Sequence, residues 1–159
     1  MRDGDIKTDA ISLLTADHRE AKQLFEQYEK IKDNSSPEEK LTIAKEVCGA
    51  LLIHMAIEES IFYPKVKAGI DDDDLMNEAE VEHNGAKDLI IQLGELKPDD
   101  PMFDAKIKVL SEQIDHHVKE EETEMFPEVR QSKLDLDALG EELFAAKNKL
   151  RVEHGLPPQ

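Results

Sequence analysis

The chain of 159 residues contains few glycines and prolines and a single cysteine. Seven glycines and seven prolines are too few for the many tight turns of an all-β fold, so the composition favours helices. The single cysteine, Cys48, cannot form a disulfide within the chain. Cys48 falls in the middle of a predicted helix, where we expect it to be a small packed core residue.

Long apolar runs and positive charge are also scarce. No apolar run is long enough to span a bilayer, and the segment Met1 to Asp5 lacks the apolar core of a signal peptide. Twenty Lys and Arg stand against 37 Asp and Glu, a formal net charge of −17. A surface of that sign repels phosphate backbones and anionic lipid, so we expect no binding to nucleic acid or to a membrane surface. With the lone cysteine, these features predict a cytoplasmic protein.

Apolar residues recur every three or four positions in five segments, which is the period of an α-helix. Four long helices and a shorter amphipathic fifth helix are predicted, at about residues 9–32, 37–67, 73–96, 102–130 and 136–150. Four long helices with short links predict an all-α fold, an antiparallel up-down four-helix bundle. We expect residues 1–131 to form the bundle, and 132–159 to add a short helix packed on it and a frayed tail.

Several residues mark the expected ends of these helices. Ser36 is a plausible N-cap with Pro37 at the first helical position, and Gly69 a C-cap. Pro64 is expected to kink or end the second helix. The acidic run Asp71–Asp74 lacks the alternating ligands, central glycine and closing glutamate of a calcium loop. We interpret it as capping and dipole compensation for the third helix.

Two helical segments place polar residues where apolar ones belong. His54 and Glu58 are four residues apart, as are His117 and Glu121, so each pair lies on one face of its helix. Each pair is followed by a second glutamate and by an aromatic residue and proline: Glu59 and Phe62-Tyr63-Pro64, then Glu122 and Phe126-Pro127. Burying two carboxylates requires a cation, and neither apolar stripe contains Lys or Arg.

The first and third helices each add a histidine to an apolar stripe, His18 and His83. The chain repeats itself, since His18 and His83 are 65 residues apart and His54 and His117 are 63 apart. His116 points about 100° away from its neighbour on the helix and is not expected to be a ligand.

Four imidazoles, two carboxylates and no thiolate predict a metal site. The candidate ligands are His18, His54, Glu58, His83, His117 and Glu121. Six ligands are too many for one zinc ion, so we expect two metals with the glutamates bridging them. Such a nitrogen-rich set favours iron over manganese or zinc and leaves open positions for a small diatomic molecule. Ferritin-like di-iron bundles instead use Glu-x-x-His and more carboxylates than histidines, which argues against a ferroxidase of that kind.

These motifs resemble the hemerythrin-like family, also called the HHE cation-binding domain. The resemblance covers roughly residues 8–130 and rests on Asp17-His18, Glu82-His83 and the two His-x-x-x-Glu-Glu motifs with their closing prolines. It implies a four-helix bundle holding two iron ions (Fe2+/Fe3+) with a bridging oxo or hydroxo group. By motif match, the terminal ligands would be His18, His54, His83 and His117, and the bridges Glu58 and Glu121.

The chain departs from the oxygen-carrying members of that family at one position. Those members have a second histidine one turn after the third-helix histidine, where this chain has Lys87. We therefore expect one iron to be less saturated, or a neighbouring glutamate such as Glu59 or Glu122 to supply the ligand.

The sequence supports three functions. The first is the binding of O2 or NO at an open iron, in an apolar pocket lined by Phe25, Ile61, Phe62 and Phe126. The second is a di-iron enzyme acting on hydrogen peroxide or nitrogen oxides, with an acid or base drawn from Lys87, Tyr28 and Tyr63. The third is an iron- or oxygen-responsive sensor that unfolds on metal loss and acts through a separate, unknown protein partner.

Overall fold

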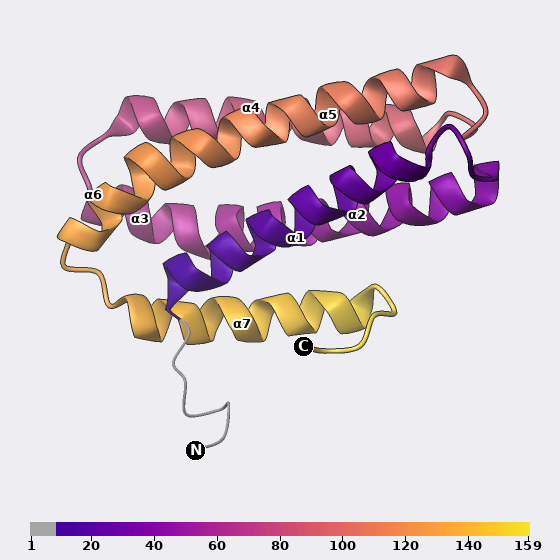
Figure 1. Ribbon diagram of the computed structural model, residues 1–159. Coiled ribbons are helices and arrows are strands. Elements are labelled where there is room, and N and C mark those ends of the chain that lie inside the picture. Colours follow the sequence, from indigo (N-terminus) through magenta and orange to yellow (C-terminus); the bar gives the residue numbers. More distant parts are fainter. Residues whose placement is uncertain (1–8) are drawn as a thin grey trace.

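The computed structural model describes residues 9–159, so the prediction about Met1 to Asp5 lies outside the described residues. The described part is helical throughout (Figure 1). In chain order the elements are α1 (Ala10–Ile31), α2 (Pro37–Ile57), η2 (Glu58–Phe62), α3 (Tyr63–Gly69), α4 (Asp73–Gly94), α5 (Pro101–Glu120), η3 (Glu121–Met125), α6 (Phe126–Gln131) and α7 (Leu136–Glu153). The two η elements are π-helical.

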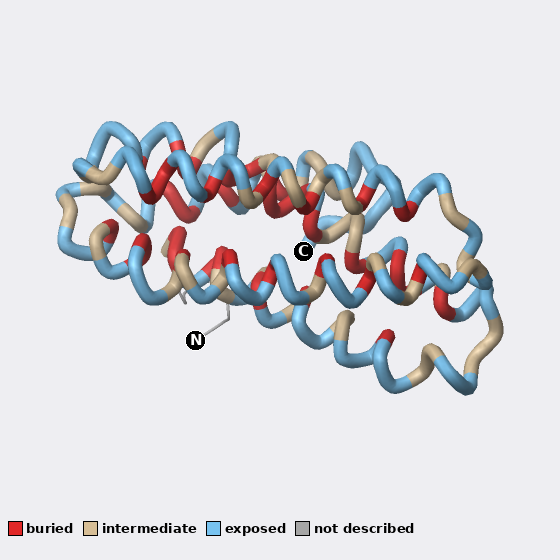
Figure 2. The backbone as a smooth tube through the Cα atoms, turned by 90° about the horizontal axis from the view of Figure 1, so that it is seen from above, coloured by how far each residue is buried: buried red, intermediate tan, exposed pale blue. Residues whose placement is uncertain are grey.

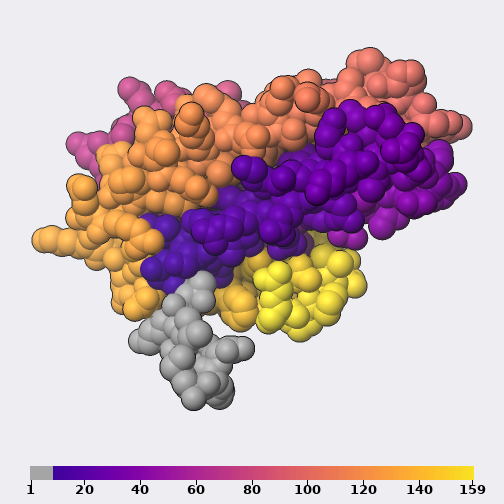
Figure 3. Space-filling view, in the orientation of Figure 1, coloured from indigo at the N-terminus to yellow at the C-terminus, as the bar shows by residue number. Residues whose placement is uncertain are grey.

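These elements form five rods, because α2, η2 and α3 run on without a break, as do α5, η3 and α6. The rod of α2 returns along α1, and the rod of α5 returns along α4, which gives the predicted antiparallel bundle (Figure 1). The fifth rod, α7, packs against α1 and α2 on the outside (Figure 3). Within residues 9–159, no helix combines the length and the apolarity that a bilayer crossing requires.

Side chains cap the start of each long helix. Asp9, Ser36 and Asp72 accept hydrogen bonds from the backbone three residues on, at Ser12, Glu39 and Leu75 respectively. The predicted N-cap at Ser36 is therefore confirmed. Asp72 caps α4, and Asp73 and Asp74 lie in its first turn, as we interpreted the acidic run.

The predicted C-cap at Gly69 is wrong. Gly69 is the last helical residue, and the capping residue is Ile70, whose backbone is extended (φ −126°, ψ 156°). Gly69 instead allows the Leu134 side chain to approach the backbone closely. A Cβ built at Gly69 would lie 2.9 Å from Cγ of Leu134, so the absence of a side chain at Gly69 leaves room for the Leu134 side chain to pack here.

The two prolines neither end nor break their rods, because the backbone widens just before them. Tyr63 N–H donates to the carbonyl of Glu58, and Phe126 N–H donates to that of Glu121, five residues back in each case. The wider turn accommodates the rings of Pro64 and Pro127, which would crowd a regular α-helix. Each π-helical segment begins at the glutamate of a His-x-x-x-Glu motif.

Apolar side chains form two clusters, one at each end of the bundle, and the buried residues face inward between the rods (Figure 2). The first cluster lies at the α3 and α6 end and includes Leu14, Phe62 and Val129. The second lies at the other end and includes Val47 and Leu110, with Cys48 packed against it. Burial raises the pKa of the Cys48 thiol to about 11, in keeping with a packed residue. The polar candidate ligands lie between the two clusters.

Candidate metal centre

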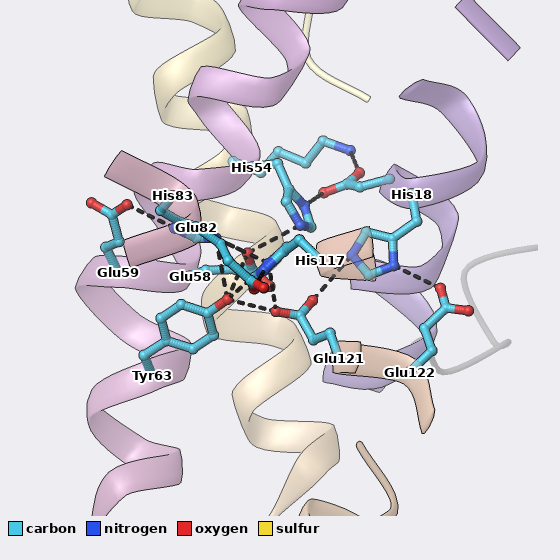
Figure 4. A network of polar contacts seen from close by, with 12 residues as sticks. His18, His54, Glu58, Glu59, Tyr63, Glu82, His83, His117, Glu121 and Glu122 are labelled. Atoms are coloured by element: carbon cyan, nitrogen blue, oxygen red, sulfur yellow. Dashed lines mark hydrogen bonds and ion pairs between the residues drawn. The ribbon is translucent and has the colours of Figure 1, made fainter. Parts of the chain in front are cut away.

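The structure brings the six candidate ligands together in the layer between the two apolar clusters (Figure 4). Each of the four long rods contributes a histidine, and both π-helical segments contribute a glutamate at their first residue. All six side chains are buried: His18, His54, Glu58, His83, His117 and Glu121. The glutamates are the most deeply buried, at 0% exposure for Glu58 and 1% for Glu121.

Each glutamate lies between two imidazoles from different rods. Glu58 Oε1 is 3.2 Å from His54 Nε2 and 3.1 Å from His83 Nε2. Glu121 Oε1 is 3.1 Å from His18 Nε2, and its Oε2 is 3.2 Å from His117 Nε2. The ligand atoms form two groups, one with His18, His54 and both glutamates, the other with His83, His117 and Glu58. Two neighbouring cations sharing carboxylates would fit this arrangement.

A carboxylate holds the outer nitrogen of every one of these histidines. The Nδ1 contacts are His18 to Glu122 at 2.7 Å, His54 to Asp17 at 2.9 Å, His83 to Glu59 at 2.8 Å and His117 to Glu82 at 2.7 Å. Such contacts orient an imidazole and leave Nε2 free to bind a metal ion. Glu59 and Glu122 therefore lie behind the histidines, and the expectation that one of them supplies a ligand does not fit this structure.

Four buried atoms at the centre make no well-aligned hydrogen bond: His18 Nε2, His54 Nε2, Glu58 Oε2 and Glu121 Oε1. Three of them nevertheless lie close to an opposite group, since His18 Nε2 is 3.1 Å from Glu121 Oε1 and His54 Nε2 is 3.2 Å from Glu58 Oε1. A buried polar atom without a partner is costly, and native proteins contain few of them. Here all four are nitrogen or oxygen donors that point into one place. The donor set therefore fits a bound cation, which would satisfy all four atoms.

The raised pKa values of two candidate ligands, His54 and His117, show the same need for positive charge. Burial lowers the pKa of His54, but the carboxylates of Glu58 and Asp17 outweigh it and hold this pKa well above 6.5. Burial likewise opposes protonation of His117, yet Glu121 and Glu82 raise its pKa to about 10. Without metal, imidazolium protons therefore neutralise the buried carboxylates, and a metal ion would have to displace them.

Tyr63 belongs to the centre as well. Its hydroxyl donates to Glu121 Oε2 at 2.5 Å and lies 3.3 Å from Glu58 Oε1. The same oxygen is 3.2 Å from His83 Nε2 and 3.3 Å from His117 Nε2. Burial, together with the charges of Glu121 and Glu58, raises the pKa of Tyr63 well above 10, so the hydroxyl keeps its proton.

From the sequence we predicted Tyr63 only as one of three candidate acids or bases. A stronger signal was available in the repeat, because position 63 corresponds to Phe126 in the second half. The first half therefore has a tyrosine hydroxyl next to the candidate ligands, where the second half has only a phenyl ring. Phe126 instead packs parallel to the His18 ring, with centroids 6.0 Å apart, and edge-on to Phe62.

The other two candidate acids lie elsewhere. The Tyr28 hydroxyl donates to Asp104 Oδ1 at 2.6 Å, and Tyr28 lies ten residues along α1 from His18, about 15 Å away along the helix axis. Lys87 Nζ contacts Glu59 Oε1 at 2.6 Å on the outer side of His83. Neither side chain faces the candidate ligands. His116 is exposed and pairs with Glu82 and Glu120, outside the centre.

A small cavity of about 30 Å³ adjoins the candidate ligands. Its lining includes the four candidate histidines together with apolar side chains such as Leu51 and Ile114. On this measure a cavity of about 10–15 Å³ holds one water molecule, so this one has room for a molecule of only a few atoms. The predicted lining is wrong for this cavity, because none of Phe25, Ile61, Phe62 and Phe126 lines it. Phe62 and Phe126 are buried in the first apolar cluster instead, and Phe25 and Ile61 are half-buried.

Two comparisons with known proteins indicate the same family. Residues 9–129 match the family profile described as the hemerythrin HHE cation binding domain. A crystal structure of a hemerythrin HHE cation binding domain-containing protein from Mycobacterium kansasii, an Rv2633c homologue, superposes with a TM-score of 0.79. The two chains are 26% identical, and the match covers 91% of this chain and 88% of the other.

The third similarity is to a longer protein. A DNA nickase from Nostoc sp. (strain PCC 7120) is 25% identical over 145 residues, which is 90% of this chain. The match covers 40% of the nickase, so this chain spans less than half of its length.

Proposed function

This chain belongs to the hemerythrin HHE cation-binding family, and we propose that it holds two iron ions and binds a small diatomic ligand such as O2 or NO. Four buried nitrogen and oxygen atoms that converge on one place without a well-aligned hydrogen bond carry this proposal. One ion would be held by His18 and His54, the other by His83 and His117, with Glu58 and Glu121 shared. Iron is proposed because the donor set is rich in nitrogen and contains no thiolate. Bound iron would supply the redox chemistry and the position where the ligand attaches.

The protein's contribution is to limit what reaches the ions. The adjoining cavity of about 30 Å³ admits a molecule of a few atoms and excludes larger ones. Its apolar lining, with residues such as Leu51 and Ile114, favours an uncharged ligand over a hydrated ion. The six ligands come from rigid helices, and an outer carboxylate orients each histidine, so the site needs little rearrangement to bind.

A second function is supported by Tyr63. A di-iron enzyme acting on hydrogen peroxide needs a proton donor near the metals, and the Tyr63 hydroxyl contacts Glu121 at 2.5 Å. Its raised pKa keeps the proton on the oxygen at neutral pH. In this function Tyr63 would deliver a proton to the oxygen that leaves, and Glu121 would orient that hydroxyl.

Metal analysis and the absorption spectrum of protein purified in air test the shared premise. About two irons per chain with the charge-transfer band of an oxo-bridged pair would support it, while fewer than one metal per chain would contradict it. Reversible spectral change on adding and removing O2 favours ligand binding. Sustained turnover of hydrogen peroxide, with the protein unchanged at the end, favours the enzyme.

We do not extend the activity of the Nostoc nickase to this chain, which matches 40% of that protein. The net charge of −17 opposes contact with a phosphate backbone. We therefore expect no binding to duplex DNA at physiological salt, and a gel-shift titration of the iron-loaded protein checks this. A salt-sensitive shift at micromolar protein would contradict it.

A further inference from the structure

α7 buries a lysine next to the candidate metal centre. Lys147 is 7% exposed, and burying its ammonium group requires a partner. That partner is Asp17 on α1, whose Oδ1 lies 2.5 Å from Lys147 Nζ. The only other buried lysine in residues 9–159 is Lys40, which pairs with Asp104 at the opposite end of the bundle.

Asp17 links this lysine to a candidate ligand. Its second oxygen, Oδ2, lies 2.9 Å from His54 Nδ1. Both the Asp17 and the Lys147 side chains are less than a tenth exposed, so water screens the contact weakly. A continuous chain of charged contacts therefore runs from Lys147 through Asp17 to the imidazole of His54.

In the second half, α4 to α6, no helix from outside the bundle makes such a connection within residues 9–159. Lys87 contacts Glu59, which holds His83, but this lysine lies on α4 itself and its side chain is 34% exposed. The residue that corresponds to Asp17 is Glu82, which holds His117 Nδ1 at 2.7 Å. Its other oxygen lies 3.4 Å from His116, an exposed residue of α5 itself. A helix from outside the four-helix core therefore reaches only the half with His18 and His54.

α7 also closes the cavity beside the centre. Lys147 and Arg151 line that cavity together with His18 and His54. Leu139 and Leu143, on the preceding turns of α7, are buried in the first apolar cluster and fix the helix against α1. Displacing α7 would open the cavity to water and leave the Asp17 carboxylate without its cation.

We propose that α7 is a cover of the metal centre, and that Lys147 couples its docking to metal retention by positioning Asp17 and His54. The inference rests on the proposed function, because it assumes that His54 binds a metal ion. Losing Lys147 would free Asp17 to turn toward water, and His54 would lose the contact that orients its ring. The coupling runs both ways, so a bound metal would also hold α7 in place.

The test compares Lys147→Met, Lys147→Arg and Lys149→Met in the full-length, iron-loaded protein. Lys149 is an exposed lysine two residues along α7, so it matches the charge change without the buried contact. The rate of iron removal by an excess of a ferrous chelator is the readout. Lys147→Met should release iron about tenfold faster than wild type, at the lower end of the effect of outer contacts to metal ligands. Lys147→Arg and Lys149→Met should stay within about twofold.

Hydrogen exchange of wild-type protein gives a second readout that does not depend on a variant that folds. Removing iron should increase amide exchange in α7 as well as at the ligands. Equal iron release from Lys147→Met and Lys149→Met would overturn the inference, as would α7 exchange that is unchanged by iron. If Lys147→Met loses its helical circular dichroism, the wild-type exchange decides. Wild-type protein that binds no metal would instead overturn the proposed function.

Discussion

The two halves of the bundle, α1 to α3 and α4 to α6, share one arrangement of contacts but differ at single residues. In each half, the acid before the first histidine holds the histidine of the following rod, as Asp17 holds His54 and Glu82 holds His117. The acids that follow Glu58 and Glu121 each hold a histidine across the bundle: Glu122 holds His18, and Glu59 holds His83. The repeat therefore reproduces the candidate ligands and also the contacts that orient them.

The halves differ in what fills the space next to the ligands. Between His83 and His117 lies the hydroxyl of Tyr63, whereas Phe126 packs against His18 at the corresponding place. The two histidine nitrogens that lack a well-aligned hydrogen bond, those of His18 and His54, both belong to the other half. A repeated helix pair thus supplies two similar groups of candidate ligands, and the exchange of tyrosine for phenylalanine makes their surroundings chemically unequal.

The largest effect is expected from the shared glutamates. Glu58→Gln and Glu121→Gln each replace a carboxylate that contacts histidines of two rods, and an amide is a much weaker bridge between cations. Both variants should fall from about two metals per chain to fewer than one, measured by elemental analysis. Glu124→Gln, an exposed change in η3, is the control and should keep both metals. Two metals in either glutamine variant would refute the shared role.

Tyr63→Phe makes the two halves alike and tests the difference directly. If the enzyme function holds, losing the proton donor should slow hydrogen peroxide turnover per iron about 100-fold or more. Tyr28→Phe removes a hydroxyl at the far end of the bundle, where it contacts Asp104, and should leave turnover unchanged. Unchanged turnover per iron in Tyr63→Phe, with metal content reduced, would assign Tyr63 a role in metal binding in place of proton delivery.

The outer carboxylates should have smaller effects, each confined to one half. Glu122→Gln replaces the carboxylate at His18 Nδ1 by a neutral amide, a weaker acceptor, and Glu59→Gln does the same at His83 Nδ1. Each should weaken binding of one of the two metals about 10- to 100-fold, measured by competition with a chelator. Binding of both metals at wild-type affinity in either variant would show that these contacts do not orient the ligands.

The smallest effect concerns pH and separates the metal-free protein from the loaded one. In the metal-free protein, the raised pKa of His54 and His117 stabilises the fold below about pH 6.5, the unfolded value of imidazole. That contribution is lost as pH rises through the folded pKa, about 10 for His117. Urea midpoints between pH 7 and 10 should therefore fall for metal-free protein and less for loaded protein, whose imidazoles are already neutral. Parallel pH curves would contradict the proton assignment.

Local patterns in the sequence were enough to predict the helices and their shared interior. Ser36 and the acidic run were correctly placed at helix starts, because a capping side chain acts within three residues of itself. Gly69 was misread as a cap, because its reason lies across space at Leu134. The π-helical turns before Pro64 and Pro127 were also missed, since apolar spacing does not report a widened turn.

The sequence alone determined the all-α bundle and which six side chains would turn inward, because a period of 3.6 residues assigns each position to a face. Only the tertiary structure decided what those side chains meet. It placed Glu59 and Glu122 behind the histidines, brought the Tyr63 hydroxyl between His83 and His117, and joined Lys147 to Asp17 across 130 residues of chain. Contacts between rods depend on how the rods are rotated and packed against each other, which no single helix encodes.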